Sequence, residues 1–181
     1  MSSILVVSGS PSVSSRSEGL ARRVGAQLGR TGAQVSYLSV RDLPAEALAY
    51  ADFGHPAIVA SQQQLARADA VVIATPIYKA SCSGLLKMWL DLLPQYGLEG
   101  KSVLPLATGG SLAHALALDY GVRPILSSMN PRTVVRGLLV TDGQITKNDD
   151  GSIELDQAAE AMLDDVIAGF IGSFQPVLIA A

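Results

Sequence analysis

Short apolar runs of strand length alternate along the chain with stretches long enough for helices, and this alternation restricts the possible folds most strongly. The runs are continuous rather than alternating with polar residues, which indicates strands buried on both faces. Strands that alternate with helices form parallel sheets covered by helices on both sides. We therefore predict an α/β fold with a doubly wound sheet of five parallel strands and helices on both faces. The runs lie at residues 4–7, 35–38, 70–74, 103–107 and 134–140.

The spacing of apolar residues between the runs predicts the helices. Residues 16–30 form the first helix, because Leu20, Val24 and Leu28 repeat at four-residue spacing. Gly32 follows as a stop signal. The other predicted helices span residues 56–68, 81–93, 111–129 and 155–170, and irregular segments are expected at 40–55 and at the polar, turn-rich residues 143–151.

Composition and charge exclude several classes of protein. The chain has 181 residues, of which 49% are hydrophobic and 16% charged, and this balance fits one compact domain rather than a disordered or fibrous chain. The net charge of −3, without a basic run, argues against a nucleic-acid-binding surface. We find no internal repeat or linker. We predict one domain over residues 1–175, followed by an apolar tail at 176–181.

The sequence also bears on the compartment of the protein. It shows no signal peptide and no run of ~18 apolar residues, so we predict neither export by that route nor a membrane span. Cys82 is the only cysteine, which excludes an intrachain disulfide and suits a reducing compartment. We therefore expect a cytoplasmic protein, and we assign no metal site.

The first loop, residues 8–17, follows the first predicted strand and leads into the first helix. A helix start attracts an anion because its first N–H groups are unpaired and its dipole end is positive. The loop is rich in serine hydroxyl groups, Arg16 adds positive charge, and Gly9 lets the backbone approach a ligand closely. This pattern favours a phosphate site. The alternative interpretation is an ordinary capping box of Ser15 and Glu18.

Two common nucleotide-binding motifs are absent from the sequence. No Gly-x-Gly-x-x-Gly follows the first strand, and no Gly-x-x-x-x-Gly-Lys-Ser/Thr occurs anywhere. The dinucleotide-fold and P-loop interpretations are therefore excluded. A monophosphate bound without magnesium, as in a mononucleotide flavin, suits the first loop better.

Two further loops follow the third and fourth predicted strands. In the strand order 2-1-3-4-5, the ends of strands one and three flank the switch point, where open α/β sheets bind ligands. The second loop, residues 75–79, contains Pro76, which stiffens the backbone beside two side chains that can cover a planar ring. The third loop, residues 107–111, contains paired glycines and Ser111, which can cap the next helix. Each loop alone is also typical of an ordinary strand exit or turn, so the prediction of a flavin site depends on their coincidence.

The predicted helix at 111–129 contains a proline. Pro124 cannot donate a hydrogen bond to the Tyr120 carbonyl and crowds it sterically, so we expect a bend or a π-turn near Tyr120. One inserted residue also explains why the apolar stripe of Leu112 and Leu116 does not continue in phase with the later apolar residues. The alternative is that Pro124 and the glycine before it separate two helices.

These motifs together resemble those of the NADPH-dependent FMN reductase family of flavodoxin-like fold. Within it they are most similar to the flavin reductases that are paired with alkanesulfonate monooxygenases. The resemblance covers nearly the whole chain, although residues 143–181 depart from the pattern. The similar segments are Gly9-Ser-Pro with Ser14-Ser-Arg-Ser17, Ala74-Thr-Pro-Ile-Tyr-Lys-Ala80, Ser83-Gly84, Leu86-Lys87, Asp91-Leu-Leu-Pro94, Leu104-Pro-Leu-Ala-Thr-Gly-Gly110, Ala113-His114, and Asp119-Tyr120 with Pro124.

The resemblance implies where FMN binds. In these reductases the tyrosine that matches Tyr120 is an inserted residue that makes a π-helix at a tetramer interface, near the flavin of a neighbouring subunit. We interpret Tyr120 as a gate for flavin retention and release. By the resemblance, the FMN phosphate contacts Ser8, Ser10, Arg16 and Ser17, and the ring lies beside Pro76, Ile77, Tyr78, Lys79, Thr108, Gly109, Gly110 and Ser111.

The resemblance also implies the reaction. The expected activity is hydride transfer from NADPH or NADH to weakly held FMN, with reduced FMN supplied to a partner monooxygenase in sulfonate or organosulfur desulfonation. We assign no acid or base, and we interpret His114 as structural. Helices 81–93 and 111–129 carry more apolar surface than the sheet can cover, so we expect a homodimer or homotetramer through them. The expected interface residues on helix 81–93 are Leu85, Trp89 and Leu93.

Three other functions stay open on the sequence alone. A reductase with tightly bound FMN that acts on quinones, azo dyes or chromate has the same fold and loops. A flavodoxin-type electron carrier shares them too, but it does not oxidise NAD(P)H rapidly by itself. A nonenzymatic scaffold binds no FMN.

Overall fold

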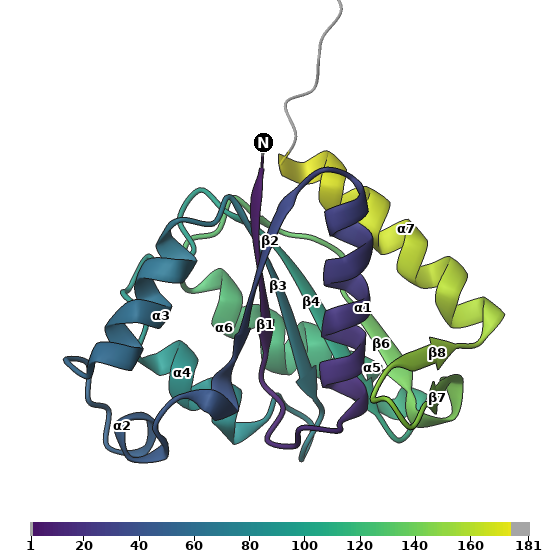
Figure 1. Cartoon of the computed structure of the whole chain (residues 1–181), viewed down its shortest axis with the longest axis horizontal. Helices are drawn as coiled ribbons and strands as arrows, with labels where there is room; N and C mark the ends of the chain where they lie inside the picture. Colours follow the sequence, from purple (N-terminus) through teal and green to yellow (C-terminus); the bar gives the residue numbers. More distant parts are fainter. Residues whose placement is uncertain (1, 175–181) are drawn as a thin grey trace, which may run out of the picture.

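The computed structural model describes residues 2–174 and assembles the predicted strands into one parallel sheet (Figure 1). The strand order is β2-β1-β3-β4-β5, and each neighbouring pair is parallel. This confirms the predicted order 2-1-3-4-5 and the flavodoxin-like fold. The apolar tail predicted at 176–181 lies outside the described residues. The four longer strands are β1 (Ser3–Ser8), β2 (Gln34–Ser39), β3 (Ala70–Pro76) and β4 (Ser102–Gly109).

The fifth strand differs from the single run predicted at 134–140. Two short segments, β5 (Thr133–Val134) and β6 (Leu138–Thr141), pair with β4 one after the other. The interruption contains Gly137, where a Cβ atom would lie 2.7 Å from the Pro105 carbonyl oxygen. Because Pro105 has no N–H, β4 offers no donor at this point, and the ladder breaks there.

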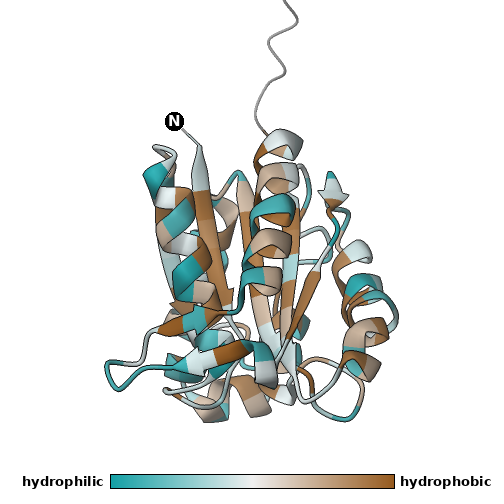
Figure 2. Ribbon diagram, turned by 90° about the vertical axis from the view of Figure 1, so that its right-hand side faces the viewer, coloured by the Kyte–Doolittle hydropathy of each residue, from teal (hydrophilic) through white to brown (hydrophobic). Residues whose placement is uncertain are grey.

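Helices cover both faces of the sheet because successive residues of each strand point to opposite sides. Ile4 and Val6 of β1 belong to one buried apolar cluster, whereas Leu5 and Val7 belong to the other. Figure 2 shows hydrophobic residues concentrated on the strands between the helical layers. The first cluster is covered by α1 (Arg16–Arg30) and α7 (Gln157–Phe174), and the second by α3 (Pro56–Ala66), α4 (Gly84–Asp91) and the helical segment that follows β4.

The helical segment after β4 changes its winding along its length. A π-helical turn, η3 (Leu118–Val122), contains Tyr120, and Pro124 stands in the first turn of the helix that follows. The π-turn expected near Tyr120 is confirmed. Within residues 2–174, no helix combines the length and apolar character that a membrane crossing requires. The other parts of the segment are η2 (Leu112–His114), α5 (Ala115–Ala117) and α6 (Arg123–Ser127), and the irregular region after β2 holds η1 (Val40–Asp42) and α2 (Ala45–Ala49).

The predicted loop at 143–151 is instead part of a β-hairpin. A 3₁₀ turn, η4 (Asp142–Gln144), leads into β7 (Ile145–Lys147), which pairs antiparallel with β8 (Ile153–Leu155). Strands of three residues, with only half of the side chains exposed, leave too short a pattern to recognise. We refer to residues 142–155 as the hairpin segment.

The apolar side of α4 faces the core rather than solvent. Trp89 is fully buried and Leu93 is 8% exposed, so the expectation that they form a subunit interface is wrong. The Trp89 indole Nε1–H donates to the Ser61 hydroxyl at 3.0 Å, which joins α4 to α3. Leu85 is half-buried and packs against the same core. The layer of α2 and α3 therefore covers the surface that we expected to be unpartnered.

Candidate functional site

The three predicted loops meet at the carboxyl edge of the sheet because β1, β3 and β4 are neighbours. Backbone hydrogen bonds tie each loop to the next strand. The Gly9 N–H donates to the Ala74 carbonyl at 2.8 Å, and the Ile77 N–H donates to the Thr108 carbonyl at 2.9 Å. The loops that were expected to share one site are therefore held side by side.

The first loop buries the serines that were predicted to bind phosphate. Ser8, Ser10 and Ser17 are each less than 5% exposed. The Ser10 hydroxyl donates to the Ser12 carbonyl at 3.1 Å and accepts from the Ser12 N–H at 3.2 Å, so it shapes the loop in the protein alone. Gly9 is required by packing, since a Cβ atom there would lie 2.5 Å from the Leu86 Cβ. The space left by the absent Gly9 side chain is therefore filled by Leu86 of α4 and is not available to a ligand.

The start of α1 combines a helix cap with a free donor. The Ser15 hydroxyl accepts from the Glu18 N–H at 3.0 Å, which is the forward half of the predicted capping box. The Glu18 carboxylate does not return a bond to the Ser15 N–H, because it pairs with Arg22 and Arg41 instead. The buried Arg16 Nε has no hydrogen-bond partner within residues 2–174, and its nearest acid is Asp142, at 3.7 Å. A buried donor without an acceptor at a helix N-terminus fits the phosphate of a flavin.

Glu18 is a buried carboxylate that connects α1 with the chain after β2. Arg22 Nε lies 2.9 Å and Arg41 Nη1 3.2 Å from its two oxygens. Burial by itself raises the pKa of Glu18, but the Ser8 hydroxyl and the two guanidinium groups outweigh it and hold the pKa below the ordinary value of 4.5. Glu18 is therefore ionised at neutral pH and fixes the rear of the first loop.

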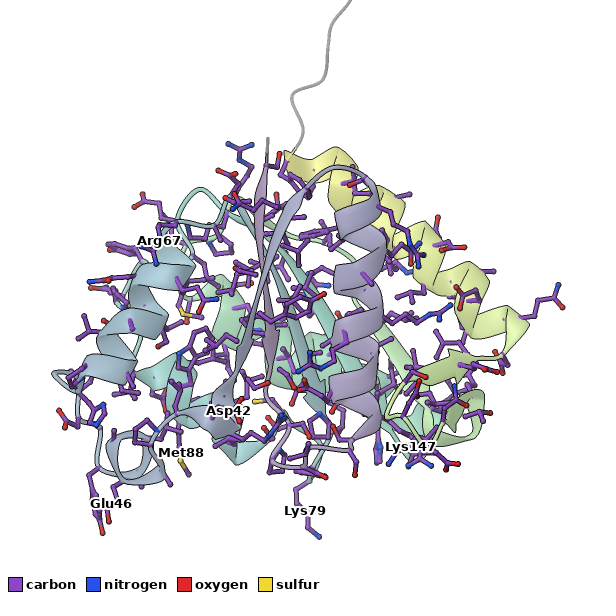
Figure 3. All side chains as sticks on the ribbon, in the orientation of Figure 1. Asp42, Glu46, Arg67, Lys79, Met88 and Lys147 are labelled. Carbon is purple, nitrogen blue, oxygen red and sulfur yellow. The ribbon has the colours of Figure 1, made fainter. Side chains whose placement is uncertain are left out.

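The second loop ends in a tight turn with unusual backbone angles. Tyr78 and Ser81 exchange two backbone hydrogen bonds, of 2.9 and 3.1 Å, around Lys79 and Ala80. Lys79 has φ +49° and Ala80 has φ +61°, in the left-handed region. Ile77 is buried, whereas Tyr78 is 51% exposed, and Figure 3 shows Lys79 pointing outward at this edge. The loop thus presents one aromatic side chain and one cation to the outside.

The third loop packs against the helical segment that follows it. A Cβ atom at Gly109 would lie 2.8 Å from the His114 Nδ1, whereas Gly110 faces open space. The His114 Nδ1 is buried and has no hydrogen-bond partner in the described part of the chain. Ser111 precedes η2 but makes no side-chain cap, so that expectation is wrong. Thr108 is buried, and its carbonyl is occupied by the second loop.

Tyr120 lies on the π-turn with its side chain 79% exposed. The next residue, Gly121, faces the turn that ends the second loop, where a Cβ atom would lie 3.0 Å from the Ala80 carbonyl oxygen. The π-turn and the second loop are therefore in contact.

Cysteine and metal chemistry have no evident place at this edge. Burial raises the pKa of the Cys82 thiol, which disfavours the reactive thiolate. Among residues 2–174, no group of three or more His, Cys, Asp or Glu side chains is arranged to hold a metal ion.

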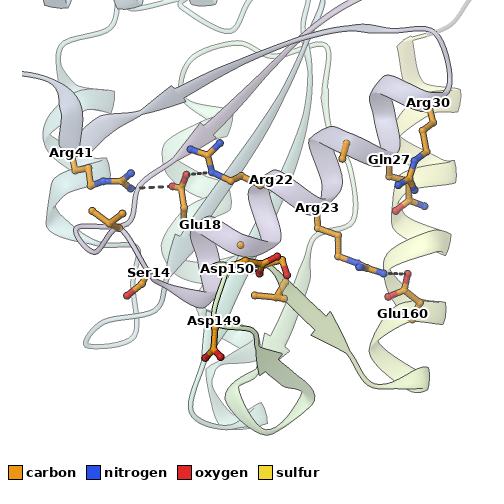
Figure 4. A pocket seen from close by; sticks show the side chains of 16 residues that line it. Ser14, Glu18, Arg22, Arg23, Gln27, Arg30, Arg41, Asp149, Asp150 and Glu160 are labelled. Carbon is orange, nitrogen blue, oxygen red and sulfur yellow. Dashed lines mark hydrogen bonds and ion pairs between the residues drawn. The ribbon is translucent and has the colours of Figure 1, made fainter.

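A separate groove of about 770 Å³ runs along the outer side of α1 (Figure 4). It is lined by α1, the tip of the β7–β8 hairpin and residues 13–14 of the first loop, and it includes no residue of the second or third loop. Three of its arginines have carboxylate partners: Arg22 and Arg41 bind Glu18, and Arg23 binds Glu160. The groove therefore lies next to the first loop and not at the meeting point of the three loops.

Comparison with known proteins decides the family. The sequence model described as NADPH-dependent FMN reductase matches residues 2–146, which include all three loops. The chain belongs to this family. It is an NAD(P)H:FMN oxidoreductase, with FMN and a nicotinamide nucleotide as its cofactors.

Individual members of the FMN reductase family are similar over most of their length. An FMN reductase (NADPH) from Pseudomonas putida KT2440 is 42% identical over 168 residues, covering 92% of this chain and 85% of the relative. An FMN reductase (NADPH) from Escherichia coli K12 is 41% identical over 142 residues, covering 78% and 74%. The crystal structure of the apo form of the NADH:FMN oxidoreductase EMOB superimposes with a TM-score of 0.87 at 39% identity, covering 98% of this chain and 92% of that one.

Proposed function

We propose that this FMN reductase uses FMN as a diffusible substrate and supplies reduced FMN to a separate flavin-dependent monooxygenase. The proposed reaction of the partner is desulfonation of sulfonates or related organosulfur compounds. Support comes from the series of motifs similar to flavin reductases paired with alkanesulfonate monooxygenases. We include in the proposal a cytoplasmic location and a single FMN-binding domain over residues 1–175.

The observation that carries the proposal is the junction of three loops beside a buried donor that lacks an acceptor among residues 2–174. The Arg16 Nε is that donor, and it lies at the start of α1, where the helix dipole also favours an anion. In the proposal, Arg16 and the amides of the first loop hold the phosphate. The proposed phosphate contacts are Ser8, Ser10, Arg16 and Ser17.

The second and third loops orient the ring in this proposal. When bound, FMN supplies the acceptor for the hydride of the nicotinamide. The chain contributes position rather than proton transfer, so no acid or base is assigned. Tyr78 is exposed enough to cover a ring face, and Gly110 leaves space for close approach of a ligand. The proposed ring contacts are Pro76, Ile77, Tyr78, Lys79, Thr108, Gly109, Gly110 and Ser111.

We further propose that the protein is a homo-oligomer, a dimer or a tetramer, and that Tyr120 gates retention of FMN at the interface. Leu112, Leu116 and Tyr120 recur every four residues and are 70%, 63% and 79% exposed. Three large side chains on one face of a helical segment are typical of a buried contact between subunits.

The experiment is to follow NADPH and NADH oxidation at fixed enzyme concentration while free FMN is titrated. We expect a rate that saturates with FMN, and a purified protein that retains little flavin. Both nicotinamides are needed, because the names of the relatives give NADPH for two and NADH for the third.

Other outcomes identify the alternatives. An FMN-independent rate with a quinone acceptor, from a protein that stays yellow, contradicts the diffusible-flavin proposal and indicates a tightly bound flavin. FMN binding without NAD(P)H oxidation indicates an electron carrier. Absence of FMN binding at micromolar concentration contradicts the site itself.

A further inference from the structure

The hairpin segment is fixed against the proposed phosphate site. The Lys147 ammonium donates a hydrogen bond to the Ser14 carbonyl of the first loop. The Ile153 side chain covers Gly19 in α1, where a Cβ atom would lie 2.4 Å from the Ile153 Cγ2. Figure 1 shows β7 and β8 beside the lower end of α1, and Figure 3 labels Lys147 there. Residues of the hairpin segment are therefore neighbours of any anion bound at this end of α1.

Asp142 at the base of this segment forms a loose ion pair with Arg16. The distance of 3.7 Å from Arg16 Nε to Asp142 Oδ1 is within ion-pair range but too long for a hydrogen bond. The two side chains are 40% and 47% exposed, so their attraction is weakened by solvent. Arg16 is thus held near a carboxylate while its Nε stays without an acceptor within residues 2–174.

We propose that Asp142 competes with the FMN phosphate for Arg16 and thereby keeps retention of the flavin weak. This inference rests on the proposed function, because it assigns the phosphate to Arg16. A carboxylate beside Arg16 lowers the positive potential at the site and repels a phosphate that carries up to two negative charges. An enzyme that delivers reduced flavin to a partner gains faster release from this repulsion.

The test measures the Kd of FMN and of riboflavin for the full chain and for Asp142→Asn. Riboflavin has the same ring without the phosphate, so it reports the rest of the site. We expect Asp142→Asn to lower the Kd of FMN by about three- to tenfold at low salt, as for partly exposed charges a few ångströms apart. The Kd of riboflavin stays unchanged, and the gain for FMN shrinks at 0.5 M salt as screening increases.

Asp165→Asn is the matched control. Asp165 also pairs with an arginine, Arg136, at 3.4 Å, and it is 72% exposed on α7. The control changes the net charge by the same amount, so its Kd for FMN is expected to equal that of the wild type. An equal gain in the control would show a net-charge effect and overturn the proposal.

A double variant decides whether Arg16 transmits the effect. In an Arg16→Met background, Asp142→Asn is expected to change the Kd of FMN less than twofold, because the guanidinium for which Asp142 and the phosphate compete is absent. Unchanged or weaker FMN binding by Asp142→Asn, repeated with Asp142→Ser in case the first variant folds poorly, overturns the proposal. Wild-type protein that binds no FMN contradicts the proposed function instead, so the two failures are distinguishable.

Discussion

At the scale of single residues, the most informative side chain is Glu18, a carboxylate that is 5% exposed. Isolated buried charges are strongly unfavourable, and Glu18 is tolerated because Arg22 and Arg41 reach it from two elements. Arg41 stands in η1, after β2, and is itself largely buried. The interaction therefore anchors the end of a strand at the edge of the sheet to the first turn of α1, behind the first loop.

Glu18→Gln is expected to lower the free energy of unfolding by about 1–3 kcal/mol at pH 7, because Arg41 loses its carboxylate partner inside the protein. Since folding lowers the pKa of Glu18, its contribution is complete above the ordinary value of 4.5 and is lost as pH falls through the folded-state pKa. Urea denaturation at several pH values should show the gap between wild type and variant closing below about pH 4.5. The exposed Glu46→Gln is the control, and a gap that does not depend on pH would contradict this account.

At the scale of elements, the turn at 78–81 is the clearest case of backbone strain. Both central residues of this two-residue turn have positive φ, which is the geometry that asparagine and glycine adopt most readily. This chain places Lys79 and Ala80 there, at a cost of roughly 1–2 kcal/mol per residue. The turn persists because its ends are bonded to each other and because Gly121 of the π-turn packs against the Ala80 carbonyl. Strain of this kind concentrates at functional sites.

Ala80→Gly is expected to raise the free energy of unfolding by about 0.5–1 kcal/mol. Glycine relieves the strain of the positive φ, but part of this gain is lost because glycine also increases the entropy of the unfolded chain. Ala51 has φ +53° and lies outside the three loops, so Ala51→Gly is a matched control with a similar expected gain. Urea denaturation gives the stabilities, and the FMN titration gives the KM for FMN. We expect only Ala80→Gly to raise that KM. A KM that is equal in both variants would show that the turn geometry is not used for the flavin.

Sequence patterns predicted the elements that bury a long apolar face and missed the features that depend on contacts between distant parts of the chain. α1 begins and ends as predicted, because Ser15 caps it and Gly32, with φ +88°, follows it. The π-turn was predictable because a proline within a helix requires a rearranged carbonyl. The split of the fifth strand depends on Pro105 in a different strand, so no local pattern reveals it. The contact of Asp142 with Arg16 had no sequence signal, since it joins residues that are far apart in the chain.

At the scale of the whole molecule, helices cover both faces of the sheet, and the segment at 112–127 still exposes large apolar side chains to solvent. The segment at 112–127 buries Ala117, Leu118, Val122 and Leu126 against the sheet while exposing its other side. Because the apolar side of α4 is buried within the chain, the proposed subunit contact is expected at this segment instead.

Light scattering is expected to give a mass of two or four chains for the wild type and a smaller mass for Leu116→Asp, because a carboxylate in an apolar contact is unfavourable.

Tyr120→Ala should change both flavin retention and the turnover with free FMN. Tyr50→Ala is the control, since Tyr50 is 83% exposed and lies outside the segment. A wild-type mass of one chain would contradict the oligomer, and unchanged retention and turnover in Tyr120→Ala would contradict the gate.

The family match ends at residue 146, within β7, but α7 (Gln157–Phe174) completes the cover of one sheet face. Leu163, Ile167 and Phe170 of α7 lie in the same cluster as β1, β3 and β4. The apolar cover of this sheet face therefore extends beyond the residues that the family model matches. On physical grounds, this last helix needs apolar residues at helical spacing rather than a particular motif in order to shield those strands from water.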